Sequence, residues 1–126
     1  MRFLSTRGDS EPLEFANAFA AGLAPDGGLY VPESLPSIDS LLGENNLEYP
    51  ELAAAFFKLF DHDHSSEKID DLVHQSYSTF ENPANAAPLI PIADKTHVLE
   101  LFHGPTFAFK DFGLQLVGNM FEDQID

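Results

Sequence analysis

The chain has 126 residues, of which 44% are apolar, and carries 21 acidic but only 6 basic side chains, a net charge of −15 at pH 7. This length and apolar content allow an ordinary hydrophobic core, whereas the negative charge disfavours binding to nucleic acid or to an anionic membrane surface. The sequence has no Cys, which excludes disulfide bonds and thiolate metal sites. We recognise no secretory leader and no apolar run of membrane-spanning length, so we expect a cytoplasmic protein.

The first 22 residues predict a strand followed by a helix. Phe3 and Leu4 indicate a short strand that ends at Gly8. Ser10 precedes acidic residues and a proline, which is typical of a helix start, so Ser10 is the predicted N-terminal cap. Apolar residues then recur at helical spacing as far as Gly22, a residue type that commonly ends helices.

A tight turn and an irregular segment follow. The sequence Pro-Asp-Gly-Gly at 25–28 is typical of a turn, because proline presets φ and glycine tolerates positive φ. Residues 29–31 indicate a short strand that ends at Pro32. From there to Asn46, scattered proline, glycine and apolar residues predict an irregular connection.

Two helices are predicted next, over 50–60 and 67–80, with Ser65 or Ser66 as the cap of the second. The expected inner faces consist of Leu52, Ala55, Phe56, Leu59 and Phe60 in the first, and of Ile69, Leu72, Val73, Ser76, Tyr77 and Phe80 in the second. Asp-His-Asp-His at 61–64 alternates metal-ligand types. It lacks further ligands at helical spacing, so we favour a solvated turn and predict no metal site.

Composition then shifts to Pro, Ala and Asn at 81–88, where we place a domain boundary. Two strands are predicted after it, within 88–93 and 97–102, followed by a helix over 109–125. The residues expected to face inward on this helix are Phe112, Leu116 and Met120, together with Phe109 and Phe121. A strand, a turn with glycine and proline, and a helix form one unit of an α/β sheet.

Lys110 lies in His-Gly-Pro-Thr-Phe-Ala-Phe-Lys-Asp-Phe-Gly, residues 103–113, at the predicted strand-to-helix turn and between two phenylalanines. A lysine among aromatic rings favours its neutral amine, the form that attacks a carbonyl carbon. From these residues alone, a solvated lysine paired with Asp111 is the more ordinary interpretation. For His103 a hydrogen bond to the turn is favoured, and for Asp111 a structural role at the start of the helix, either as a cap or beside the helix dipole.

Two motifs resemble threonine synthases. LELFHGPTFAFKDFG, residues 99–113, is similar to the segment of that family that binds pyridoxal 5'-phosphate (PLP), and STRG with GLAPDGGLYVPESLP, at 5–8 and 22–36, is similar to its opening motifs. The resemblance implies an α+β N-terminal domain (1–80) followed by the first strand-turn-helix unit (81–126) of a fold-type II PLP-dependent α/β domain.

The resemblance also implies a reaction, the conversion of O-phospho-L-homoserine and water to L-threonine and phosphate. Lys110 corresponds to the lysine that binds PLP covalently and acts as catalytic acid and base. Phe109 is expected beside the cofactor ring, although an ordinary core position remains open. The family's other cofactor groups lie beyond residue 126, so we expect the chain alone to be inactive.

Two alternatives remain. Another fold-type II PLP lyase, such as a serine or threonine dehydratase, shares the lysine turn but generally lacks GLAPDGGLYVPE. A non-catalytic interaction module would fold and ignore PLP. The sequence does not determine the oligomeric state.

Overall fold

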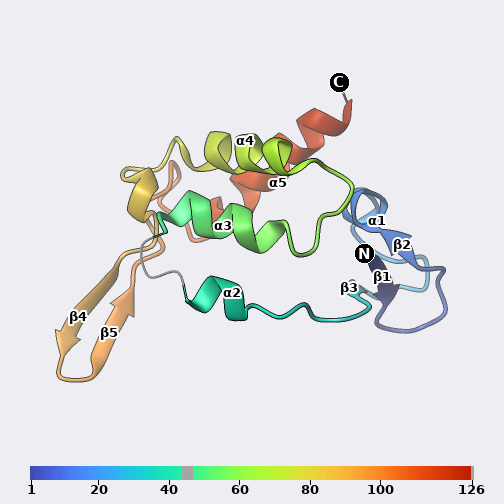
Figure 1. Cartoon of the computed structure of the whole chain (residues 1–126), viewed down its shortest axis with the longest axis horizontal. Coiled ribbons are helices and arrows are strands. Elements are labelled where there is room, and N and C mark those ends of the chain that lie inside the picture. The colour runs from blue at the N-terminus through green and yellow to red at the C-terminus, as the bar shows by residue number, and fades with distance from the viewer. Residues whose placement is uncertain (44–46, 126) are drawn as a thin grey trace. The chain divides into compact units, whose positions relative to one another are not determined.

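The computed structural model describes residues 1–43 and 47–125 and has an α+β fold (Figure 1). Its elements are β1 (Arg2–Ser5), β2 (Leu13–Glu14), α1 (Phe15–Ala21), β3 (Tyr30–Pro32), α2 (Asp39–Leu42), α3 (Tyr49–Phe57), α4 (Ser66–Tyr77), a 3₁₀ turn (Pro83–Asn85), β4 (Leu89–Ala93), β5 (Thr96–Leu99) and α5 (Asp111–Ile125). They form two compact units, Met1–Glu44 with Ala55–Ile69, and Asn45–Ala54 with Asp70–Asp126.

The first unit contains a three-stranded antiparallel sheet in the order β2-β1-β3. Phe3 of the central strand is buried and packs edge-on against Phe15 at the start of α1, with ring centroids 5.7 Å apart. The strands predicted near residue 3 and at 29–31 are therefore confirmed.

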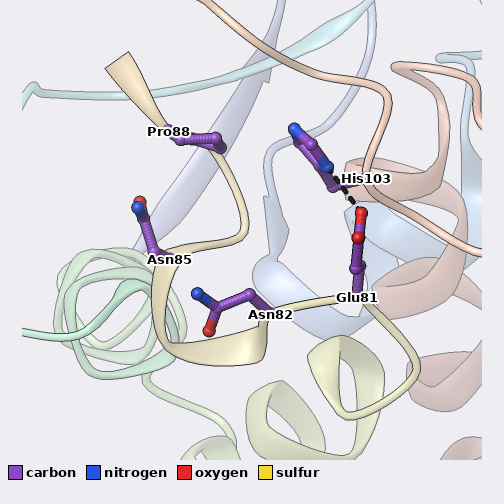
Figure 2. Close-up of a pocket in the computed structure, with 5 residues that line it drawn as sticks. All are labelled: Glu81, Asn82, Asn85, Pro88 and His103. Atoms are coloured by element: carbon purple, nitrogen blue, oxygen red, sulfur yellow. Dashed lines mark hydrogen bonds and ion pairs between the residues drawn. The ribbon is translucent and has the colours of Figure 1, made fainter. Parts of the chain in front are cut away.

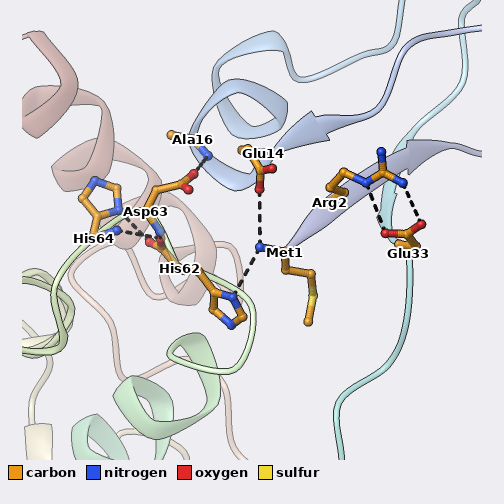
Figure 3. Close-up of polar contacts among 9 residues, drawn as sticks. Met1, Arg2, Glu14, Ala16, Glu33, His62, Asp63 and His64 are labelled. Atoms are coloured by element: carbon orange, nitrogen blue, oxygen red, sulfur yellow. Dashed lines mark hydrogen bonds and ion pairs between the residues drawn. The ribbon is translucent and has the colours of Figure 1, made fainter.

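Helix α1 begins at Phe15, four residues later than its sequence predicts. The predicted cap is wrong, because the Ser10 hydroxyl accepts a hydrogen bond from the backbone N–H of Asp26 instead. The carboxylate of Asp63 accepts the N–H of Ala16 in the first turn of the helix, at 2.8 Å (Figure 3). Gly22 ends the helix with a φ of 67°, as predicted.

The turn at 25–28 forms as predicted, and Asp26 holds it. Its carboxylate accepts the hydroxyl of Ser5 at 2.7 Å and the N–H of Gly28 at 2.8 Å. Gly27 has a φ of 80°, and a Cβ on Gly28 would overlap the Ser5 hydroxyl. Both glycines are therefore required, one by the backbone angle and the other by space.

The middle of the chain differs from prediction in two details. The connection after Pro32 contains the short helix α2, and its residues 44–46 lie outside the described part of the chain. Helix α3 ends at Phe57. Leu52 and Phe56, which were expected on its inner face, are exposed, whereas Ala54, which was not expected there, is buried. Here the apolar spacing alone did not identify the buried side.

The second unit contains α5 and most of α4 (Figure 1). The side chain of Asn119 on α5 donates to the buried hydroxyl of Ser76 on α4 at 2.8 Å. The entire predicted inner face of α4 is buried, and Ser65 caps the helix by accepting the N–H of Lys68. On α5, Leu116 and Met120 are buried as predicted.

Strands β4 and β5 pair with each other as an antiparallel hairpin, with Leu89 opposite Leu99. Both predicted strands exist, but the second ends at Leu99 rather than at residue 102. Every residue of the hairpin is exposed, so none of its side chains belongs to the buried core of the described residues. The domain boundary predicted near residues 81–88 stays a prediction.

Among the described residues, no helix is both long enough and apolar enough to cross a membrane.

Candidate functional site

Lys110 is the last residue before α5, and its side chain is exposed. Its backbone carbonyl accepts the N–H groups of Gly113 at 3.1 Å and Leu114 at 2.8 Å, which closes the first turn of the helix. The backbone of the lysine is therefore held while the amine projects outward. The exposed position does not provide the apolar surroundings that the sequence argument assumed.

Asp111, the first residue of α5, is buried to 1% exposure. Its Oδ2 accepts the N–H of Thr106 at 2.8 Å, and its Oδ1 accepts the hydroxyl of Thr106 at 2.7 Å. Burial alone would raise the pKa of this carboxyl, but the hydrogen bonds from Thr106 and from the N–H of Ala108 outweigh it and lower the pKa. Asp111 is therefore a carboxylate that bonds to the loop preceding Lys110.

Two backbone features allow the loop before Lys110 to pack closely against Asp111. A Cβ placed on Gly104 would lie 2.5 Å from Oδ2 and 2.6 Å from Cβ of Asp111, so only glycine leaves room for the carboxylate. Phe107 has a φ of 59°, a left-handed conformation that costs a bulky residue about 1–3 kcal/mol. Such strain persists only where neighbouring contacts determine the backbone.

Aromatic rings beside the lysine are uncovered. Phe107 is 79% exposed and Phe109 is 66% exposed, so the prediction that Phe109 faces inward is wrong, as it is for the exposed Phe121. The rings of Phe107 and Phe109, three and one residues before Lys110 in the chain, are thus exposed. Whether Phe109 contacts a cofactor stays a prediction.

His103 at the start of the loop bonds two carboxylates, and Figure 2 shows the bond to Glu81. Its Nδ1 lies 2.9 Å from Oε2 of Glu81, and its Nε2 lies 2.7 Å from Oε2 of Glu100. The hydrogen bonds to Glu81 and then Glu100 raise the pKa of His103, because both ring nitrogens donate only in the imidazolium form. The histidine is bonded across the fold, not within the turn as the sequence favoured.

A cavity of about 470 Å³ opens next to His103 and is lined by Glu81, Asn82, Asn85, Pro88 and His103 (Figure 2). Lys110 is not among its lining residues. The cavity and the exposed amine are therefore separate features of the second unit.

An aromatic cluster supports the start of α5. The Tyr77 hydroxyl donates to the carbonyl of Phe112 at 2.9 Å, and the Tyr77 ring packs against Tyr49 and Phe80. Burial, together with the neighbouring Tyr49, raises the pKa of Tyr77, so the hydroxyl stays protonated and remains a donor. This cluster fixes the helix turn that follows Lys110.

The Asp-His-Asp-His segment is a bonded turn. Asp61 is buried, and its carboxylate bonds Nδ1 of His64 at 2.7 Å. Nδ1 of His62 lies 3.3 Å from the amino-terminal nitrogen, and the carboxylate of Asp63 accepts the N–H of Ala16 (Figure 3). The prediction of a solvated turn is wrong for Asp61. Within residues 1–43 and 47–125, no group of three potential ligands is arranged to hold a metal ion.

The structure thus brings Gly104, Thr106, Lys110 and Asp111 together and leaves Phe109 exposed. Sequence reasoning missed Glu81 and Glu100 as partners of His103. Glu100 lies three residues before His103, a spacing that offered a signal, whereas Glu81 is 22 residues away and offered none.

A protein-family model described as "Threonine synthase N terminus" matches residues 2–77. The chain belongs to the threonine synthase family. The threonine synthase of Schizosaccharomyces pombe is 43% identical over 124 residues, which cover 95% of this chain and 24% of that protein. The chain therefore spans about a quarter of the length of this relative.

Solved threonine synthases have the same fold over this region. The PLP-bound enzyme of Brucella melitensis superposes with a TM-score of 0.91 at 37% identity, covering 98% of this chain and 27% of that one. The yeast enzyme superposes with a TM-score of 0.90 at 40% identity, covering 98% and 26%. The predicted family resemblance and the α+β fold of the N-terminal region are confirmed.

Proposed function

We propose that this chain supplies the N-terminal portion and the cofactor lysine of a threonine synthase that converts O-phospho-L-homoserine and water to L-threonine and phosphate. The observation that carries the proposal is the match to a PLP-bound threonine synthase over 98% of the chain, including the lysine loop. In this proposal residues 1–80 form the N-terminal domain, and residues 81–126 begin the fold-type II catalytic domain.

The residues around Lys110 fit a cofactor with an aldehyde and a planar ring. The amine is exposed on a loop whose backbone is held, and Phe107 and Phe109 offer uncovered rings beside it. When bound, PLP supplies an electron sink for the negative charge that develops at the α carbon of an amino acid. The phosphate of PLP needs cations or N–H donors, and the six basic residues of the chain include few near this loop. We assign its partners to the remaining three quarters of the family's length.

The proposed chemistry of the chain resides in the Nζ atom of Lys110. This nitrogen would take protons from the α and β carbons of the substrate and return protons to the γ and α carbons, as general base and acid. Phosphate departs from the γ carbon with its bonding electrons, and the oxygen of water adds to the β carbon. Phe109 is proposed to contact the cofactor ring. Without the rest of the enzyme, we expect no turnover.

The first test uses the chain itself, incubated with PLP, reduced with borohydride and digested for peptide mass mapping. Lys110 is expected to be labelled in preference to Lys58, Lys68 and Lys95, because it lies in the motif that resembles the family's PLP-binding segment and its side chain is exposed on a loop with a held backbone. Equal labelling of all four would count against a cofactor site prepared by this chain.

The second test measures turnover in a chimera, in which the chain replaces the matched 26% of the yeast enzyme. Lys110→Ala is expected to lower phosphate release from O-phospho-L-homoserine at least roughly 10²–10⁴-fold, the usual contribution of one acid–base group. Lys95→Ala removes an exposed lysine in the hairpin turn and serves as the matched control. Undiminished turnover in the Lys110→Ala chimera would refute the assignment. A chimera that accepts serine or threonine but not the phosphorylated substrate would favour a dehydratase.

A further inference from the structure

The carboxylate of Asp111 bonds the loop before α5 through Thr106, and it also accepts a hydrogen bond from the side chain of Gln115 within the helix. A capping side chain bonds the free N–H groups of the first helical turn. Here the N–H groups of Gly113 and Leu114 already bond the carbonyl of Lys110. Both carboxylate oxygens of Asp111 bond Thr106, five residues upstream. Asp111 lies in the first turn of α5, as expected for a carboxylate beside the helix dipole, but its carboxylate bonds Thr106 rather than capping the free N–H groups of the helix.

These bonds close a ring of backbone that contains Lys110. Thr106 is tied to Asp111 through its N–H and its hydroxyl, so both ends of the segment 106–111 are fixed to one buried side chain. A further hydrogen bond joins the N–H of Asp111 to the carbonyl of Ala108 at 3.0 Å. Within the ring, Phe107 is held in its left-handed conformation. The lysine backbone thus has little freedom, although its side chain is exposed.

We propose that Asp111, acting through Thr106, is the positioning residue for Lys110, fixing where the lysine side chain leaves the backbone. The inference rests on the proposed function, because fixing the position of Lys110 affects the reaction only if Lys110 binds the cofactor. Positioning matters chemically, since a displacement of about 1 Å of a reacting group can cost roughly a hundredfold in rate.

The test compares Thr106→Val, which removes the hydroxyl donor at nearly constant volume, with Thr106→Ser, which keeps it. In the ¹⁵N-labelled chain, the backbone order parameter of Lys110 is expected near 0.85 in the parent and below about 0.6 in Thr106→Val. Thr106→Ser is expected to retain the parent value. Circular dichroism should show the same helix content in all three proteins, which separates loop order from the stability of α5.

Asp111→Ala removes both bonds and should disorder the same residues more strongly. Because a buried side chain is lost in Asp111→Ala, the conclusion depends on the threonine pair, whose members leave Asp111 in place. An unchanged order parameter for Lys110 in Thr106→Val would overturn the inference.

The borohydride experiment separates this inference from the proposed function. Preferential labelling of Lys110 in the parent and in Thr106→Ser, with at least about a tenfold loss of preference in Thr106→Val, supports both. Preferential labelling that persists in Thr106→Val refutes the positioning role and leaves the proposed function intact. Absence of preference in the parent counts against the proposed function, while the order parameters still decide whether Asp111 holds the loop.

Discussion

Gly104 and Gly113 allow the same substitution to be tested in two opposite environments. A Cβ on Gly104 would lie 2.5–2.9 Å from three atoms of the Asp111 side chain, and φ of Gly104 is outside the left-handed range. On Gly113, in the first turn of α5, a Cβ meets no atom within 4 Å. Gly104→Ala therefore introduces a steric conflict, whereas Gly113→Ala introduces only a better helix former.

The expected magnitudes have opposite signs. Inserting a methyl group into a packed site typically costs about 1–3 kcal/mol, and separating Asp111 from Thr106 adds to that cost in Gly104→Ala. Replacing glycine by alanine within a helix typically gains about 0.5–1 kcal/mol, so Gly113→Ala should be stabilising. The two variants should thus differ by roughly 2–4 kcal/mol in the free energy of unfolding.

The assay is urea unfolding of each 126-residue variant, followed by far-ultraviolet circular dichroism and by tyrosine fluorescence. The slope of the free energy of unfolding against urea concentration should be the same in all variants, so the differences in stability appear in the urea concentration at the midpoint of unfolding. A Gly104→Ala midpoint equal to that of the parent would show that the loop moves away from Asp111 without cost. That result would refute the argument that Asp111 determines the path of the loop.

Two further predictions concern neighbouring contacts. Tyr77→Phe removes the hydrogen bond to the carbonyl of Phe112 and should cost about 0.5–1.5 kcal/mol in urea unfolding; an unchanged midpoint would show that the bond contributes nothing. The bonds of His103 to Glu81 and Glu100 raise its pKa in the folded state above 6.5, so their stabilisation is complete below pH 6.5 and is lost as the pH rises through the folded pKa. In the parent protein the urea midpoint should therefore fall as the pH rises through the pKa of His103, and His103→Gln should remove this fall. An equal fall in the parent and in His103→Gln would show that the bonds of His103 do not cause it.

The sequence alone predicted the features that depend on neighbouring residues, such as the buried face of α4 and the positive φ of two glycines. The apolar spacing of α4 identified every buried residue of its inner face, because a long amphipathic helix buries one face whatever covers it. The positive φ of Gly22 and Gly27 follows equally from residue type. The predicted strand-to-helix turn placed Lys110 at the entrance to a helix, and α5 begins at the next residue, Asp111, two residues later than the predicted start at 109.

Contacts between distant residues required the tertiary structure. The helix α1 is capped by Asp63, 47 residues from Ala16, so inspection of the residues before the helix selected Ser10 instead. The pairing of β4 with β5 likewise depends on which strand edge is available, and a strand pattern does not specify its partner.

The lysine loop combines both kinds of information. Sequence alone identified Lys110 through its motif and expected Asp111 to act at the start of the helix, but it did not connect Asp111 with Thr106 or Gly104. The structure shows that both oxygens of Asp111 turn back to Thr106 and occupy the space beside Gly104. The Asp111 side chain reaches Thr106 because the backbone between them turns back on itself. A spacing of five residues in the sequence does not specify such a turn.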